Sequence, residues 1–314
     1  MNESDAIKQF HHLFKGRPDA LGTWDGPGSG IARGPHAYAD TVDHLCSPAG
    51  KRWIGVYPHL GTSIDGHSHV TWGCIDVDGK DFDHDFPKMW GLANTLRIML
   101  EIKNVFGHIE QTRNGYHLWV FPEGGKANAA HMRRALMAAC KAVNYDPKEV
   151  NPKSETLETG KIGNYVRLPY HGYLSDTTQH ERKFCDGYDD LYGLEEWLTL
   201  KLRYTALDAL ETVAALWTPP PVATFDGPVP DNIQALLTAV RGLTYSIWRD
   251  GPLEGRDRSN TLAKLGYNLK EDGMSMPAAF SIVKDADTRW GKFFGREDCD
   301  EQIMGIIERC YSHA

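Results

Sequence analysis

Two aspartates interrupt an apolar run between Trp72 and Gly79, and this stretch constrains the fold and the chemistry more than any other. The run reads Trp-Gly-Cys-Ile-Asp-Val-Asp-Gly, with the acids at Asp76 and Asp78. In a β-strand, residues two apart point out of the same face, so the two carboxylates would lie side by side. Burial raises carboxylate pKa values, and a divalent cation reverses this. The pattern predicts either a hard-metal site at the end of a strand or a plain strand end followed by an Asp-Gly turn.

Length and charge limit the class of protein. The 314 residues are enough for a sizeable core and for two domains. No apolar run is long enough to cross a bilayer and no signal-peptide pattern opens the chain, so we expect no membrane partner and a cytosolic location, in the host cytosol if the gene is viral or plasmid-borne. The net charge is −8. Because proteins that grip many phosphates carry basic surface, contact with nucleic acid should be local, weak or helped by metal ions.

Cysteine and histidine spacing does not favour a zinc site. The six cysteines form no CxxC pair, which argues against a disulfide framework and a zinc ribbon. His59, His67 and His69 could share a metal, but without an acid or thiol at matching spacing a solvated surface is the simpler interpretation. We expect no zinc.

Periodicity along the first 217 residues predicts an α+β fold in which helices cover one side of a mainly antiparallel sheet. A Gly/Pro-rich stretch, 22–34, is expected to be loop. The expected helices are 6–14, 87–106, 127–143 and 194–217. The expected strands are 53–58, the run ending at Asp78, 106–110 and 116–121, with a tight turn at 112–115.

A proline-rich segment, 218–230, separates this part from an all-helical one. Proline-rich sequence cannot hold a helix or a central strand, so we expect a linker there. The expected domains are 1–217 and 231–314. In the second, Asp231 should cap a helix to 241, and further helices should span 259–270, 275–290 and 298–311.

Four motifs in order resemble the catalytic core of the archaeo-eukaryotic primase superfamily. They are Ile-Asp-Val-Asp at 75–78, Gly-Tyr-His-Leu-Trp-Val-Phe at 115–121, Glu-Val-Asn-Pro-Lys at 149–153 and Gly-Asn-Tyr-Val-Arg-Leu-Pro at 163–169. The superfamily has an acid-x-acid strand, a strand with a lone histidine and a third acid downstream. The resemblance covers about residues 50–175. Residues 254–260, Glu-Gly-Arg-Asp-Arg-Ser-Asn, and the helices after them are similar to a small helical primase C-terminal domain of phage and plasmid replication proteins.

The resemblance implies roles for these residues. Asp76 and Asp78 would be catalytic metal ligands, with Glu149 or, as the alternative, Asp146 as the third acid. Two Mg²⁺ or Mn²⁺ ions would activate a 3′-hydroxyl for attack on an α-phosphate. His117 would contact the phosphates of the incoming nucleotide; the alternative is a core histidine bonded to backbone.

Other residues would complete nucleotide and template binding. Relatives often carry serine two places before the histidine; here that position is Gly115, with Thr112 as the nearest hydroxyl and the backbone N–H groups of the turn as further phosphate donors. The implied nucleotide-binding set is Thr112, Arg113, His117, Lys161, Arg167 and His171. Arg113 and Lys161 could instead be solvated, and Arg167 could pair with a structural carboxylate. Arg256, Arg258 and Asn260 would contact a template phosphate or the initiating nucleotide, or form helix-capping salt bridges.

The implied function is that of a DNA primase-polymerase, which makes primers de novo on single-stranded DNA from nucleoside triphosphates and extends them. One alternative is a metal-dependent nuclease with water as the nucleophile. Another is a non-catalytic replication-initiation or helicase-loading module. The sequence contains no GxxxxGK[ST] motif, so helicase activity would come from a separate protein.

Overall fold

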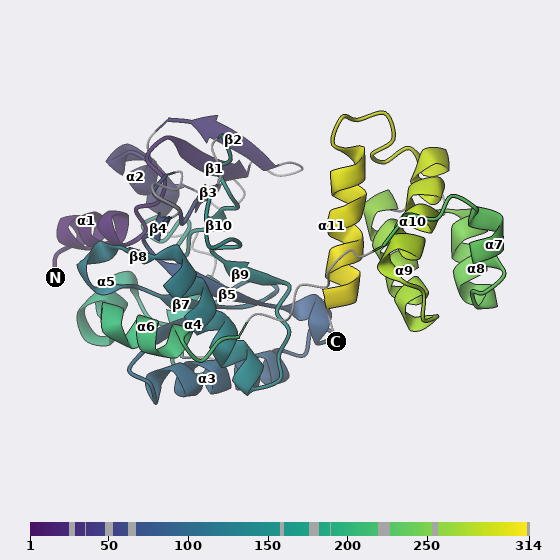
Figure 1. The fold of residues 1–314 in the computed structure, drawn as a ribbon. Helices are drawn as coiled ribbons and strands as arrows, with labels where there is room; N and C mark the ends of the chain where they lie inside the picture. The colour runs from purple at the N-terminus through teal and green to yellow at the C-terminus, as the bar shows by residue number, and fades with distance from the viewer. Residues whose placement is uncertain are drawn as a thin grey trace. The chain divides into compact units, whose positions relative to one another are not determined.

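The computed structural model describes residues 1–24, 29–34, 36–47, 53–61, 67–157, 160–175, 182–188, 190–218, 227–252 and 257–312. The chain divides into two compact units, Met1–Thr218 and Pro219–Ala314 (Figure 1). This division falls at the start of the segment predicted as a linker, of which residues 219–226 lie outside the described part. Each unit has its own core.

The larger sheet of the first unit contains the two aspartates. Its order is β11-β6-β7-β5-β9, and each strand is antiparallel to its neighbours. The strands are β5 Gly73–Asp78, β6 Gly107–Gln111, β7 Gly115–Val120, β9 Glu149–Asn151 and β11 Lys183–Cys185. The predicted tight turn joins β6 to β7, where the Thr112 N–H donates to the Gly115 carbonyl at 2.8 Å. The predicted α+β class is confirmed.

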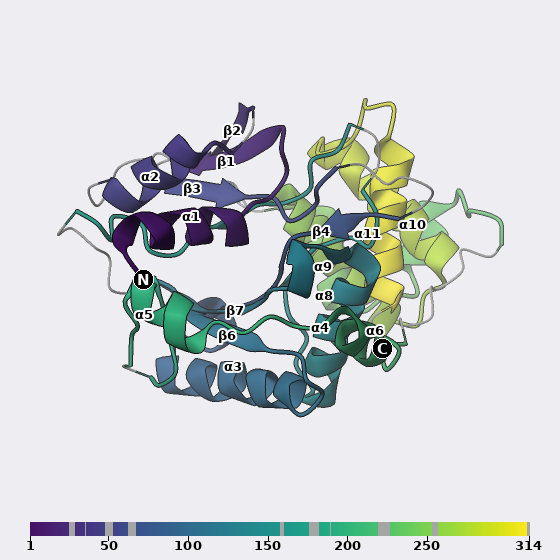
Figure 2. The same cartoon turned by 90° about the vertical axis from the view of Figure 1, so that its left-hand side faces the viewer.

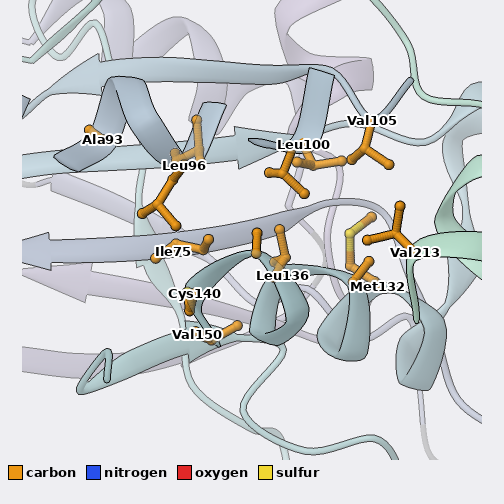
Figure 3. Packing of buried hydrophobic residues seen from close by; sticks show 14 of the residues in the cluster. Ile75, Ala93, Leu96, Leu100, Val105, Met132, Leu136, Cys140, Val150 and Val213 are labelled. Carbon is orange, nitrogen blue, oxygen red and sulfur yellow. The ribbon is translucent and has the colours of Figure 1, made fainter. Parts of the chain in front are cut away.

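Helices cover one face of this sheet. They are α3 Phe86–Glu101, α4 Ala129–Ala142 and α6 Leu207–Ala214. Ile75 and Val150 leave the sheet on this side and pack among Leu96 and Leu136 of the helices (Figure 3). Asp85 caps α3 and Asn128 caps α4 by accepting backbone N–H bonds. Truncating a buried leucine of this kind to alanine lowers the free energy of unfolding by about 2–5 kcal/mol. The packing of these helices therefore stabilises the strands that position Asp76.

A second sheet corrects the prediction of a loop at 22–34. Its order is β10-β3-β1-β2, with β1 Ala20–Trp24, β2 Ser29–Arg33, β3 Trp53–Val56 and β10 Val166–Arg167. The glycine at position 22 signals close packing and not a loop, because a Cβ at Gly22 would lie 2.3 Å from the ring of Tyr165. A short pair, β4 His69–Val70 and β8 Ala127–Asn128, completes the sheets of the described residues.

The first helix joins the two larger sheets. α1 Glu3–Leu13 and α2 Tyr38–Cys46 lie beside the second sheet, with α1 toward the larger sheet (Figure 2). The Phe14 ring, just after α1, lies 5.1 Å from Trp119 and 5.3 Å from Phe121 of the larger sheet. Ile54 and Val56 of β3 belong to the same buried cluster. An aromatic core therefore closes part of the sheet face opposite α3 and α4.

The predicted helix 194–217 is wrong in its middle. The segment forms α5 Leu194–Glu196, a π-helical turn η3 Trp197–Lys201 and, after a break, α6. Thr205 explains the break: its N–H donates to the Phe121 carbonyl at 2.8 Å, its carbonyl accepts the Glu123 N–H at 2.8 Å, and its hydroxyl accepts the Phe106 N–H. These tertiary bonds replace helical ones.

The second unit is helical, as predicted, but its first helices differ. Asn232, not Asp231, caps α7 Ile233–Leu237, and the unpredicted α8 Gly242–Asp250 follows. The remaining helices are α9 Arg258–Glu271, α10 Met276–Trp290 and α11 Cys299–Ser312. A search of the described residues of both units finds no helix that combines the length and apolarity needed to cross a membrane.

Candidate active site

Four polar residues form a row across the larger sheet. Asp76 on β5 lies directly opposite His117 on β7 and directly opposite Glu149 on β9. His117 in turn lies opposite Glu110 on β6. Directly opposed residues point out of the same face, which is the face away from α3 and α4. The register therefore places Glu149, Asp76, His117 and Glu110 side by side.

Asp76 is the crowded carboxylate of this row. Its Oδ1 lies 3.7 Å from His117 Nε2, and 31% of its side chain is exposed. Burial raises the pKa of Asp76; His117 lowers it in part, whereas Asp78, Glu149 and Glu110 raise it further. A carboxyl group surrounded by other carboxylates gains most from a bound cation.

The other acids flank Asp76 near the surface. Asp78 is half-buried and caps the short helix η1 Gly79–Asp81 by accepting the Lys80 N–H at 3.2 Å. Glu149 contacts Lys153, with 2.7 Å between Oε1 and Nζ. Asp146 precedes β9 and is exposed; burial first, and Asp146 second, raise the pKa of Cys140 in the core under the opposite face. Of the two candidates for the third acid, only Glu149 shares the row with Asp76.

The donor set suits Mg²⁺ or Mn²⁺, because all three candidate ligands are carboxylates. Among the described residues no three His, Cys, Asp or Glu side chains are gathered closely enough to hold a metal, a finding that covers Asp76, Asp78 and Glu149 as well as His59, His67 and His69. Glu149 is turned onto Lys153. To serve as a metal ligand, Glu149 would have to leave this lysine.

On the side away from Asp76, His117 contacts a carboxylate, Glu110, whose role was not predicted from the sequence. Its Nδ1 lies 2.9 Å from Glu110 Oε2, and the Trp119 indole N–H donates to the same oxygen at 2.7 Å. Glu110 Oε1 pairs with Arg182 Nη2 at 3.1 Å. The sequence could have indicated Glu110, because a tight turn at 112–115 places Gln111 opposite Tyr116 and therefore Glu110 opposite His117. Arg182 comes from a distant segment and had no such indication.

Two predicted nucleotide-binding residues do not face the site. His171 is fully buried, stacked on Trp53 at 4.8 Å and packed against His44 at 5.2 Å, so it cannot reach a phosphate and is withdrawn from the set. Thr112 is also buried, and its hydroxyl accepts the Asn114 N–H at 3.4 Å. Thr112 and the backbone of the turn are thus used within the hairpin.

Three predicted cations are exposed in the first unit. Arg113 lies in the β6–β7 turn, and Lys161 precedes β10 and accepts a bond from Arg17 at its backbone carbonyl. Arg167 on β10 has its guanidinium carbon 5.8 Å from the centre of the Trp53 ring. The backbone carbonyl of Arg167 accepts from Arg182 at 3.1 Å, which ties β10 to the residue that pairs with Glu110. Arg167 is therefore linked to the His117 row through one side chain.

The three residues predicted to bind template or nucleotide in the second unit have different outcomes. Arg256 lies outside the described residues. Arg258 donates to the carbonyls of Trp290 and Gly291 at 2.8 and 2.9 Å, so it caps the end of α10 through backbone carbonyls and not through the salt bridge given as its alternative. Asn260 is exposed on α9.

Comparisons with known proteins bear on this site. Residues 35–201, more than half of the chain, match the family described as "TOTE conflict system, Archaeo-Eukaryotic Primase domain". No curated protein matches the sequence at a significant level. Among solved structures, primase RepB' is similar over 98% of this chain and 93% of its own, with 11% identity and a TM-score of 0.31. A likeness at that score adds no argument about fold or function.

Proposed function

Because the chain belongs to the archaeo-eukaryotic primase domain family of TOTE conflict systems, we propose that it is a metal-dependent primase-polymerase acting on single-stranded DNA. A primase-type function follows from the family; synthesis of primers de novo and their extension are our proposal. Its main support is Asp76, which lies between His117 and Glu149 at a partly exposed edge of the aromatic core. The resemblance implied phage or plasmid replication, whereas the family description names a conflict system, so we propose the reaction and not its setting.

Asp76, Asp78 and Glu149 would hold Mg²⁺ or Mn²⁺. A metal ion bound there would lower the pKa of the attacking 3′-hydroxyl and offset the charge that develops as the hydroxyl oxygen bonds to the α-phosphorus and pyrophosphate leaves. Glu149 would have to leave its contact with Lys153 to act as a ligand. Lys153 would then be available to pair with a triphosphate oxygen.

The remaining roles concern the nucleotide and the template. His117 binds phosphate through Nε2, the ring atom that faces Asp76. Arg113, Lys161 and Arg167 are exposed cations that would clamp the triphosphate or the template strand. In the second unit, Asn260 remains a candidate for contact with the initiating nucleotide. A net charge of −8 fits a template held locally and not along a basic surface.

Unprimed circular single-stranded DNA tests the proposal, with labelled ribo- or deoxyribonucleoside triphosphates and either Mg²⁺ or Mn²⁺. The double variant Asp76→Asn/Asp78→Asn should lose synthesis and keep its thermal unfolding temperature. Asp83→Asn is the matched control, because Asp83 is exposed and asparagine tolerates its positive φ of 51°. Undiminished synthesis by the double variant would remove the proposal.

Two assays on the wild-type protein distinguish the proposed function from its two rivals. Shortening of labelled single-stranded DNA with metal and without triphosphates would support the nuclease. Failure to bind a metal–triphosphate complex by calorimetry would support the non-catalytic module. Primer products that depend on Asp76 and Asp78 exclude both.

A further inference from the structure

Beside the proposed site lies a fully buried charged group, Glu110, which has no contact with the nucleotide in the proposed function. Glu110 has no exposed surface, yet its carboxylate lies directly behind His117. We propose that Glu110 is a positioning residue, which, together with Arg182, fixes the ring and tautomer of His117 so that Nε2 alone faces the nucleotide. This inference rests on the proposed function, since it assigns His117 a ligand there.

The hydrogen-bond donors around Glu110 determine which nitrogen of His117 carries hydrogen. Trp119 Nε1 can only donate, and it occupies Glu110 Oε2 at 2.7 Å. The Arg182 guanidinium can only donate, and its Nη2 lies 3.1 Å from Oε1. An ionised carboxylate only accepts, so the bond of 2.9 Å between His117 Nδ1 and Oε2 requires hydrogen on Nδ1. Nε2 is then the ring atom left for the site.

The charges around Glu110 agree with this assignment. Burial raises the pKa of its carboxyl group, but Arg182, His117 and Trp119 together lower it below the ordinary value. Glu110 therefore stays ionised and acts as an acceptor at neutral pH. A carboxylate that holds the far nitrogen of a working histidine fixes both its tautomer and its ring angle.

Arg182 extends the same network to the second sheet. Its Nη2, which forms the ion pair with Glu110, donates to the Arg167 carbonyl at 3.1 Å, and its guanidinium carbon lies 5.1 Å from the Trp53 ring centre. One buried guanidinium thus ties β6, which carries Glu110, to β10, which carries Arg167. The placement of His117 and that of Arg167 are coupled through it.

Glu110→Gln is the informative substitution because a carboxamide cannot satisfy both sides. If its NH₂ group faces Arg182, two donors meet. If its oxygen faces Arg182, the NH₂ group meets the Trp119 N–H, also a donor, and faces His117 Nδ1, which must then accept. We expect the second arrangement, because the Arg182 cation attracts the amide oxygen more strongly than the neutral indole does, and in it the His117 hydrogen moves to Nε2.

Long-range ¹H–¹⁵N spectra of ¹⁵N-histidine-labelled protein read the tautomer directly. The His117 signals are assigned by their loss in His117→Asn. We expect Nδ1–H in the wild type and Nε2–H in Glu110→Gln, together with a roughly 10-fold rise in KM for the triphosphate and a smaller change in kcat. Glu101→Gln, at the end of α3, is the control and should match the wild type. An Nε2–H tautomer in the wild type, or an unchanged tautomer and KM in Glu110→Gln, would overturn the proposal.

Two features keep the test decisive. The wild-type spectrum needs no variant, and Trp119→Phe, which removes one donor without creating a clash, should keep Nδ1–H if Glu110→Gln does not fold; loss of Nδ1–H there would count against the proposal. The spectra also need neither metal nor nucleotide. If the tautomer is as expected but no protein makes primers, the proposed function fails while the positioning role of Glu110 stands.

Discussion

Among the described glycines beside the site, Gly115 leaves the least room for a side chain. It lies opposite Asp78, and a Cβ added to it would be 2.1 Å from the Val77 carbonyl oxygen. That atom belongs to the backbone of β5, so a side chain here must push the strand that carries both aspartates. The serine that relatives often carry at this position therefore does not fit this hairpin without movement.

Gly115→Ala should lower the free energy of unfolding by about 1–3 kcal/mol, since the added methyl group displaces backbone. Gly91→Ala is the matched control: Gly91 is exposed in α3 with open space around it, so alanine should stabilise by about 0.5–1 kcal/mol through helix propensity. Urea unfolding of both variants measures the difference. Equal shifts would show that the contact with Val77 is not limiting.

Some residues of the site could be predicted from the sequence and others could not. The positions of Asp76, Asp78 and His117 on strands could be predicted, because each interrupts an apolar run and a charged or polar side chain in such a run needs a reason. Glu110 could have been found from the hairpin register. Arg182 could not, because it pairs across long range, and His171 was misassigned because nothing in its neighbours along the chain indicates that it lies under Trp53.

At the scale of elements, β9 depends on α4. Arg133 of α4 donates through Nη1 to the carbonyls of Val150 and Pro152 at 3.0 and 2.8 Å. β9 is a short edge strand, so these bonds add to the few that it makes with β5. The position of Glu149 is thus set partly by a helix on the other face of the sheet.

Arg133→Ala should cost roughly 2 kcal/mol of stability through lost bonds to a charged donor, and should weaken Mn²⁺ binding because Glu149 is less firmly held. Arg134→Ala is the neighbouring control. Arg134 pairs with Glu155 at the surface, 2.6 Å apart, and such pairs contribute about 0–1 kcal/mol. Calorimetric titration with Mn²⁺ compares the two. Equal losses of affinity would refute the link between α4 and Glu149.

Elements with strong periodicity were predicted well, and those shaped by tertiary contacts were not. The patterns of α3, α4 and β7 come from their own apolar faces. β1 and β2 were missed because Gly22 looks like a loop residue, although it makes room for the Tyr165 ring. The helix 194–217 was overextended because Thr205 bonds to a strand far away in sequence.

For the whole molecule, the buried histidines lie in the first unit. Burial lowers the pKa of His44 to about 3 and the pKa values of His36, His59 and His108 to about 4. After Thr218 the sequence contains a single histidine, His313. The two units should therefore respond differently to acid.

Acid should unfold the first unit selectively between about pH 6.5 and pH 4. In that window the unfolded chain binds protons at histidines that the folded unit keeps neutral, so stability falls as pH falls. A shift from 6.5 to about 4 corresponds to roughly 3 kcal/mol per histidine, and two such groups offset a typical free energy of unfolding.

Hydrogen exchange by mass spectrometry, corrected for intrinsic rates, should show β3 and β6 losing protection before α9 and α10. His44→Gln, which keeps a donor for the Pro169 carbonyl but cannot become charged, should move the midpoint to lower pH. Simultaneous loss in both units, or an unchanged midpoint in this variant, would contradict the assignment of acid sensitivity to these histidines.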